Sequence, residues 1–170
     1  MRTLILFLIL VATAGWWYFI GGRRLDDDLV RDYYLQSEQA MLHRDHEALC
    51  GMLSNDFAST SQVSMGPQRV RADDSADKAK TCESWRDLFA NWQRLGEKMG
   101  GELQLDAGHE IHSITLAADR KSAVVDISTQ LDVAGTIMNI RTHTRDQLIR
   151  RNGRVLLVRS DGSASVTSGG

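Results

Sequence analysis

The chain has 170 residues, 42% of them hydrophobic and 25% charged, which is enough for one ordinary globular core. Its formal net charge is −2, and setting aside three arginines near the N-terminus, Arg2, Arg23 and Arg24, leaves 17 basic residues against 22 acidic ones. This balance excludes the basic surface of a nucleic-acid binder, so we expect no nucleic-acid partner.

Residues 3–20 read TLILFLILVATAGWWYFI and contain no charged side chain. A helix of this length is about 27 Å long, close to the hydrocarbon core of a bilayer. The run therefore predicts a transmembrane signal anchor over residues 1–24, with the aromatic residues at 16–19 at the membrane interface. The small residues Ala12-Thr13-Ala14 leave a cleaved signal peptide open as the alternative.

Two features of the sequence give opposing predictions for the side of the membrane on which the domain lies. Arg23, Arg24 and Arg31 follow the apolar run, and by the positive-inside rule they favour the cytoplasm. The two cysteines, Cys50 and Cys82, are not in a CxxC motif and suit one disulfide in an oxidising compartment, with two buried thiols as the alternative. We expect a single-pass protein of the bacterial inner membrane with its domain in the periplasm; a cleaved periplasmic form and a cytoplasm-facing form remain open.

The first part of the domain predicts two helices. Acidic residues at 26–28 favour the positive end of a helix dipole, and apolar residues recur after them at helical spacing. Asp45 is placed to cap a second, short helix, which ends before the extended stretch SNDFAST at 54–60. The expected inward positions of the two helices are Leu29, Tyr33, Ala40 and Met41, then Leu49, Cys50 and Leu53.

The stretch HRDHEALCGMLSNDF, residues 43–57, is rich in metal-ligand types. His43 and His46 are three residues apart, as two zinc ligands on one helix would be. The predicted break near Arg44 separates them, however, and Asp45 serves as a helix cap. We therefore interpret the stretch as helix, break, helix and strand, and expect no metal ion there.

The sequence in the middle of the chain predicts an irregular segment followed by a long helix. Residues 62–79 contain Pro67, the only proline, next to Gly66 in a polar run, which favours an irregular segment. A long amphipathic helix is expected from Asp77 to Met99, stopped by glycines at 100–101. Its core-facing stripe is Cys82, Trp85, Leu88, Phe89, Trp92, Leu95 and Met99.

After Gly101 the hydrophobic period changes from that of a helix to that of a strand. In SAVVDISTQLDV, residues 122–133, apolar and polar side chains alternate, as in a half-buried strand. Turn signals at 119–121, Gly135 and Asn152-Gly153 divide the remainder into four strands, and Asn-Gly favours a type I′ turn. The expected arrangement is an antiparallel meander, on which His109, His112 and His143 occupy solvated positions.

This order of elements resembles the nuclear transport factor two-like fold, the cone-shaped α+β domain shared with SnoaL-like cyclases and ketosteroid isomerase. The resemblance spans about residues 29–166 and is carried best by HRDHEALCGMLSNDF and by RTHTRDQLIRRNGRVLLVRSDG, residues 141–162. It implies N-terminal helices packed in a strongly curved antiparallel sheet over residues 25–166, with a flexible tail at 167–170. It also implies a pocket at the open end of the cone, often a homodimer through the sheet, and a disulfide between Cys50 and Cys82.

The closing hairpin locates the expected pocket. Counting outward from the Asn152-Gly153 turn pairs Asp146 with Arg159, as a cross-strand ion pair. Met138 and Ile140 share the face of Asp146, which favours that face as the lining of the cone, although an exposed surface pair fits equally well. The expected ligand-binding residues are Tyr34, Trp92, Thr144, Asp146 and Arg159.

The expected function follows from the same resemblance. Ketosteroid isomerase chemistry would require a tyrosine on the first helix, for which Tyr33 or Tyr34 qualifies, and two acids inside the cone. Asp56 lies near one acid position and nothing matches the second, so we assign no catalytic residue, cofactor or metal. We expect a membrane-anchored module that binds a small apolar ligand or an envelope protein. The alternatives are a structural component of an envelope or secretion complex and a SnoaL- or ketosteroid-isomerase-like enzyme.

Overall fold

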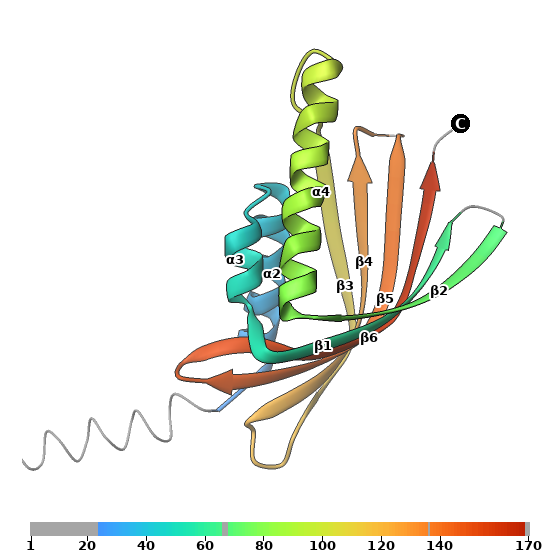
Figure 1. The fold of residues 1–170 in the computed structure, drawn as a ribbon. Coiled ribbons are helices and arrows are strands. Elements are labelled where there is room, and N and C mark those ends of the chain that lie inside the picture. The colour runs from blue at the N-terminus through green and yellow to red at the C-terminus, as the bar shows by residue number, and fades with distance from the viewer. Residues whose placement is uncertain (1–23, 66–67, 136, 169–170) are drawn as a thin grey trace, which may run out of the picture.

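A computed structural model of the chain describes residues 24–65, 68–135 and 137–168. In it, three helices pack against one side of a curved six-stranded sheet (Figure 1). The predicted membrane anchor and the cleavage site considered for residues 12–14 lie outside the described residues. In the part of the chain that is described, no helix has the length and hydropathy needed to cross a membrane.

The first two helices follow the sequence prediction. α2 spans Asp27–Leu42 and α3 spans His46–Gly51, and between them Arg44 adopts a positive φ of 56°. The Asp45 side chain accepts a hydrogen bond from the amide of Ala48 at 2.9 Å, so Asp45 caps α3 as expected. Among the described residues, His43 and His46 belong to no cluster of three metal-ligand side chains. The expectation of a capped helical break is confirmed.

The predicted irregular segment at 62–79 is wrong. β1 spans Leu53–Met65 and β2 spans Gln68–Asp77, and the two strands pair antiparallel from Ala58 opposite Asp77 to Met65 opposite Gln68. β2 forms one edge of the sheet. An edge strand is held by backbone hydrogen bonds to a single neighbour, so a strand can form here without the hydrophobic alternation that was sought in the sequence.

The long helix α4 spans Lys78–Lys98, capped at its start by Asp77, whose side chain accepts from the amide of Lys80 at 2.9 Å. In the middle of α4, the side chains of Phe89 and Trp92 are buried. The prediction of a core-facing stripe is wrong for the last two positions, because Leu95 is 40% and Met99 56% exposed. Figure 1 shows why: the C-terminal end of α4 reaches beyond the strands on which it packs.

The remaining strands form the predicted meander. β3 spans Leu105–Leu116, β4 Ser122–Val133, β5 Met138–Arg151 and β6 Arg154–Ser168, each antiparallel to the next. The sheet order is β2-β1-β6-β5-β4-β3, and β1 lies parallel to β6. At the β5–β6 turn Asn152 and Gly153 both have positive φ, 53° and 78°, as a type I′ turn requires.

The sheet has two chemically different faces. We call the face that packs on the helices the inner face and the opposite one the outer face. Two apolar clusters hold the helices on the inner face, one around α2 and one around α4. The first includes Val30, Tyr33, Tyr34, Val125, Ile127 and Leu148, and the second Leu49, Phe89, Trp92, Leu103 and Val133.

One disulfide and two hydrogen bonds fix the ends of the helical layer. A disulfide joins Cys50 of α3 to Cys82 of α4 across a sequence separation of 32 residues, as the fold resemblance implied. At the start of α2, the amide of Leu25 donates to the carbonyl of Arg120 at 2.6 Å, and Arg150 Nη1 donates to the carbonyl of Arg24 at 2.5 Å. The first described residues are therefore attached to the β3–β4 turn and to β5.

Candidate functional site

A buried acid, Asp146 on β5, lies on the inner face opposite α2. The Tyr34 hydroxyl donates to its Oδ2 at 2.9 Å and the Ser160 hydroxyl donates to its Oδ1 at 2.7 Å. Asp146 is 6% and Tyr34 7% exposed. No lysine or arginine among the described residues pairs with this carboxyl group. Within the described part of the chain, Asp146 is thus an acid held by hydroxyl groups.

The environment of Asp146 changes its acidity. Burial raises the pKa of its carboxyl group, and this effect outweighs the hydrogen bonds from Ser160, Tyr34 and Thr144, which favour the carboxylate. Burial and the nearby Asp146 also raise the pKa of the Tyr34 phenol, which therefore stays protonated as a donor. The pair can both donate and accept hydrogen bonds, the property expected of a group that recognises a carbonyl or hydroxyl.

A second group of polar side chains lies beside the Tyr34–Asp146 pair on the inner face. His109 Nδ1 of β3 is 2.6 Å from Glu38 Oε2 of α2, and the His109 ring centroid is 6.0 Å from that of Tyr34. Thr129 is the β4 residue paired with His109, and its hydroxyl is 2.5 Å from that of Thr142 on β5. Polar side chains thus continue across three strands next to the Tyr34–Asp146 pair.

Sequence reasoning missed this group of polar side chains because its contacts cross between elements. His109 was expected at a solvated position, yet its side chain is only 16% exposed because α2 covers it. The available signal was Glu38, which lies one helical turn beyond Tyr34 and so shares its face of α2. Nothing in the local sequence states that β3 packs beneath that face.

The predicted pocket residues are only partly brought together. Tyr34 and Asp146 are in contact, and Thr144 is on the same face of β5. Trp92 belongs to the other apolar cluster, where its ring centroid is 5.6 Å from that of Phe89. Asp56, considered as an acid inside the cone, is instead exposed at the surface.

The expected ion pair between Asp146 and Arg159 is wrong, because β6 contains a bulge. Leu148 pairs with Leu157 as predicted, but the next pair is Gln147 with Arg159, so Val158 is an extra residue. From there on the register differs by one, and Ser160 rather than Arg159 faces Asp146. The side chain of Arg159 pairs with Asp161 instead, with Nε 2.6 Å from Oδ2.

Comparison with known proteins identifies the fold. No family model and no curated protein matches the sequence. Among solved structures, a nuclear transport factor two-like protein of unknown function from Shewanella oneidensis superposes with a TM-score of 0.59 at 13% identity, covering 80% of this chain and 97% of that one. A conserved protein from Planctomyces limnophilus gives 0.58 at 12%, covering 84% and 98%. A candidate scytalone dehydratase from Novosphingobium aromaticivorans gives 0.57 at 11%, covering 84% and 87%.

These likenesses concern the fold and not the activity, since all three identities lie far below the level at which function transfers. The mixed α+β architecture with its curled six-stranded sheet is that of the nuclear transport factor two-like fold. The described domain therefore has the nuclear transport factor two-like fold that the order of its predicted elements suggested.

Proposed function

We propose that the chain is a ligand-binding module that takes a small, largely apolar molecule with one carbonyl or hydroxyl group onto the inner face of the cone. The observation that carries this proposal is Asp146, a buried acid that has no basic partner among the described residues and is hydrogen-bonded to Tyr34 and Ser160. Burying such a group costs free energy, and perturbed acids of this kind are concentrated at functional sites.

The surroundings of Asp146 support a ligand that is mostly apolar. Near the C-terminal ends of β4 and β6 and the N-terminal end of β5, the inner face is only half-buried. This part of the inner face is therefore accessible to solvent. Its side chains there are hydroxyl-bearing or apolar, and none is charged. These half-buried residues are Thr129, Leu131, Met138, Ile140, Thr142, Ala164 and Val166.

We further propose that the module is held at the inner membrane with its domain in the periplasm. The apolar run at 3–20 supports the anchor, and the Cys50–Cys82 disulfide supports an oxidising compartment. An alkaline phosphatase fusion after Gly170 should be active in intact cells. An inactive fusion would place the domain in the cytoplasm, and a mature N-terminus after Ala14 would indicate cleavage.

An enzyme is the second candidate function, favoured by the raised pKa of Asp146 beside a protonated Tyr34. In that arrangement Asp146 would remove a proton from the bound molecule, and Tyr34 would exchange its hydrogen bond to Asp146 for one donated to the ligand oxygen on which charge develops. The similarity in fold to the candidate scytalone dehydratase is consistent with such chemistry. Conversion of a bound ketone or alcohol, lost in Asp146→Asn, would distinguish an enzyme from a binding module.

The binding proposal can be tested with the full-length protein in mild detergent. A panel of small cyclic ketones and phenols would be screened by thermal shift, and the best compound measured by calorimetry. Asp146→Asn and Tyr34→Phe should each weaken binding by about tenfold, the loss of one strong hydrogen bond. Asp106→Asn removes an exposed acid from the outer face and is the matched control.

Circular dichroism would confirm that each variant is folded. Equal affinity of Asp146→Asn and Asp106→Asn would remove Asp146 from the site. No binding by any compound, together with stable co-purification of an envelope protein, would favour the structural-component alternative over the ligand-binding one.

A further inference from the structure

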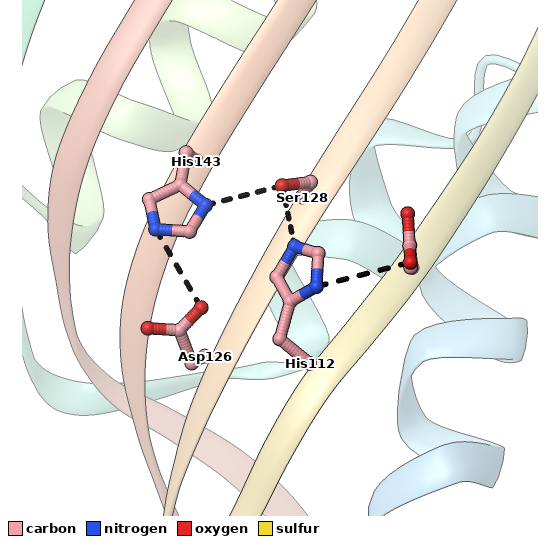
Figure 2. A network of polar contacts seen from close by, with 5 residues as sticks. His112, Asp126, Ser128 and His143 are labelled. Atoms are coloured by element: carbon pink, nitrogen blue, oxygen red, sulfur yellow. Dashed lines mark hydrogen bonds and ion pairs between the residues drawn. The ribbon is translucent and has the colours of Figure 1, made fainter.

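Three strands bring two histidines and an aspartate together on the outer face. His112 comes from β3, Asp126 from β4 and His143 from β5, and one potential ligand atom of each lies within 4.8 Å of the others (Figure 2). His143 Nε2 is 3.5 Å from Asp126 Oδ1. The two imidazole rings have their centroids 5.6 Å apart. This group is separated from the inner-face site by the thickness of the sheet.

The backbone of the sheet explains why these side chains meet. Asp126 and Ser128 are two residues apart on β4 and so share a face, and Ser128 is paired directly with His143 on β5. On β3 the register shifts between Ile111 and Ser113, which leaves His112 as an extra residue. A bulge of this kind re-aims a side chain, and here it directs the His112 ring toward Ser128.

Ser128 links the two imidazoles. Its hydroxyl is 2.8 Å from His112 Nε2 and 3.1 Å from His143 Nδ1. A hydroxyl has one proton, so it donates to one ring and accepts from the other. When it accepts from His143 Nδ1–H, the lone pair on His143 Nε2 faces the Asp126 carboxylate, an arrangement that a cation between them stabilises.

We propose that His112, Asp126 and His143 form a binding site for a divalent transition metal, zinc in the first instance, with Ser128 as a positioning residue for His143. Two imidazoles and one carboxylate are a ligand set that zinc uses when it keeps an open position. Ligands of a tetrahedral zinc lie about 3.3 Å apart, so the His143–Asp126 separation of 3.5 Å already suits it. Small rotations of the exposed His112 ring would complete the set.

The surroundings leave room for a fourth ligand. A trough of about 650 Å³ opens on the outer face, and its lining includes Glu110, Ser128 and His143. Glu110 Oε1 is 3.9 Å from His112 Nδ1, and its side chain is 80% exposed, so it is free to approach a metal or leave the position to water. The fourth position of the site therefore faces solvent.

The same residues do not make a serine nucleophile. Ser128, His143 and Asp126 occur in the order of a catalytic triad, but Ser128 lies in the middle of β4, which is paired on both sides with β3 and β5. The backbone amides around it are therefore used in the sheet. An oxyanion hole needs free donors beside the nucleophile, and these amides supply none.

The test is zinc binding by the full-length protein, prepared without a polyhistidine tag and freed of metal with a chelator. Calorimetry with zinc chloride should give one ion per chain. His112→Ala, His143→Ala and Asp126→Asn should each weaken binding by at least about tenfold, and Ser128→Ala by about tenfold through the loss of ligand orientation. His46→Ala removes a partly exposed histidine from α3 and should leave the affinity unchanged.

Cobalt provides an independent readout, because a cobalt ion bound by these ligands absorbs visible light and the absorption should disappear in His143→Ala. Zinc affinity that is equal in the wild type and in His143→Ala would overturn the proposal. An unchanged affinity in Asp126→Asn would also overturn it, since a bare histidine pair would then account for the binding. Circular dichroism of each variant excludes unfolding as the cause of a loss.

Discussion

The inner and outer faces of the same strands carry similar polar side chains in different surroundings. On the inner face Asp146 is buried, accepts hydrogen bonds from hydroxyl groups, and has a raised pKa. On the outer face Asp161, whose side chain is 43% exposed, has its pKa lowered by its hydrogen bond with Arg159. The contrast shows that desolvation, and not the presence of hydrogen-bond donors, decides the direction of the shift on this sheet.

The largest expected effect comes from removing the disulfide that joins two helices of the inner face. The double variant Cys50→Ser/Cys82→Ser should lose about 3 to 4 kcal/mol of unfolding free energy, because the loop between the cysteines is no longer closed in the unfolded chain. Urea unfolding monitored by tryptophan fluorescence would measure the loss. The wild type in reductant is the control and should approach the variant; equal stability of oxidised and reduced wild type would contradict the prediction.

A smaller loss of stability is expected when one of two glycines on opposite faces of the sheet is replaced by alanine. A Cβ at Gly162 would lie 2.8 Å from Thr144 Cα and would also meet the carbonyl oxygen of His143, whereas a Cβ at Gly108 would meet nothing within 4 Å. Gly162→Ala should therefore destabilise the protein by about 1 to 3 kcal/mol through overpacking. Gly108→Ala is the matched control and should change stability by less than about 0.5 kcal/mol. Similar urea midpoints for the two variants would show that β5 and β6 can separate at little cost.

The smallest effect is a difference in pH dependence between the faces. Because the folded-state pKa of Asp146 is raised, its contribution to stability is fully present below the ordinary carboxyl pKa and is lost as pH rises through the raised value. Asp161 behaves in the opposite way: its contribution is present above the ordinary carboxyl pKa and is lost as pH falls through the lowered value.

Unfolding free energies measured from pH 3 to pH 8 would test this difference. Relative to Asp146→Asn, the wild type should lose stability with rising pH, and relative to Asp161→Asn it should lose stability with falling pH. Parallel curves for the wild type and Asp146→Asn would mean that the carboxyl group is not desolvated, which would weaken the proposed ligand site as well.

Features that are determined by short local sequence patterns were predictable from the sequence. The Asp45 cap, the alternation along β4 and the Asn152-Gly153 turn each depend on a few neighbouring residues, and each is found as expected. The order of such elements was enough to suggest the fold. The inward face of β5 could also be chosen correctly, from Met138 and Ile140.

Features that depend on partners distant in the chain were not predictable. The bulge at Val158 moves Arg159 away from Asp146, and a count of residues from the turn assumes that no bulge exists. The bulge at His112 likewise has no local signal, and it makes Ser113 rather than His112 the backbone partner of Asp126. Both bulges change which side chains meet, so the candidate sites were less predictable than the fold that holds them.

The contacts of Arg24 and Leu25 with β5 and the β3–β4 turn fix where the chain enters the domain. That entry point lies at the end of the sheet opposite the C-terminal end of α4 (Figure 1). The first described residues of the domain are thus tied to the sheet and cannot move independently of it. The C-terminal tip of α4, with the exposed Met99, is therefore the part of the helical layer farthest from the point where the chain enters the domain.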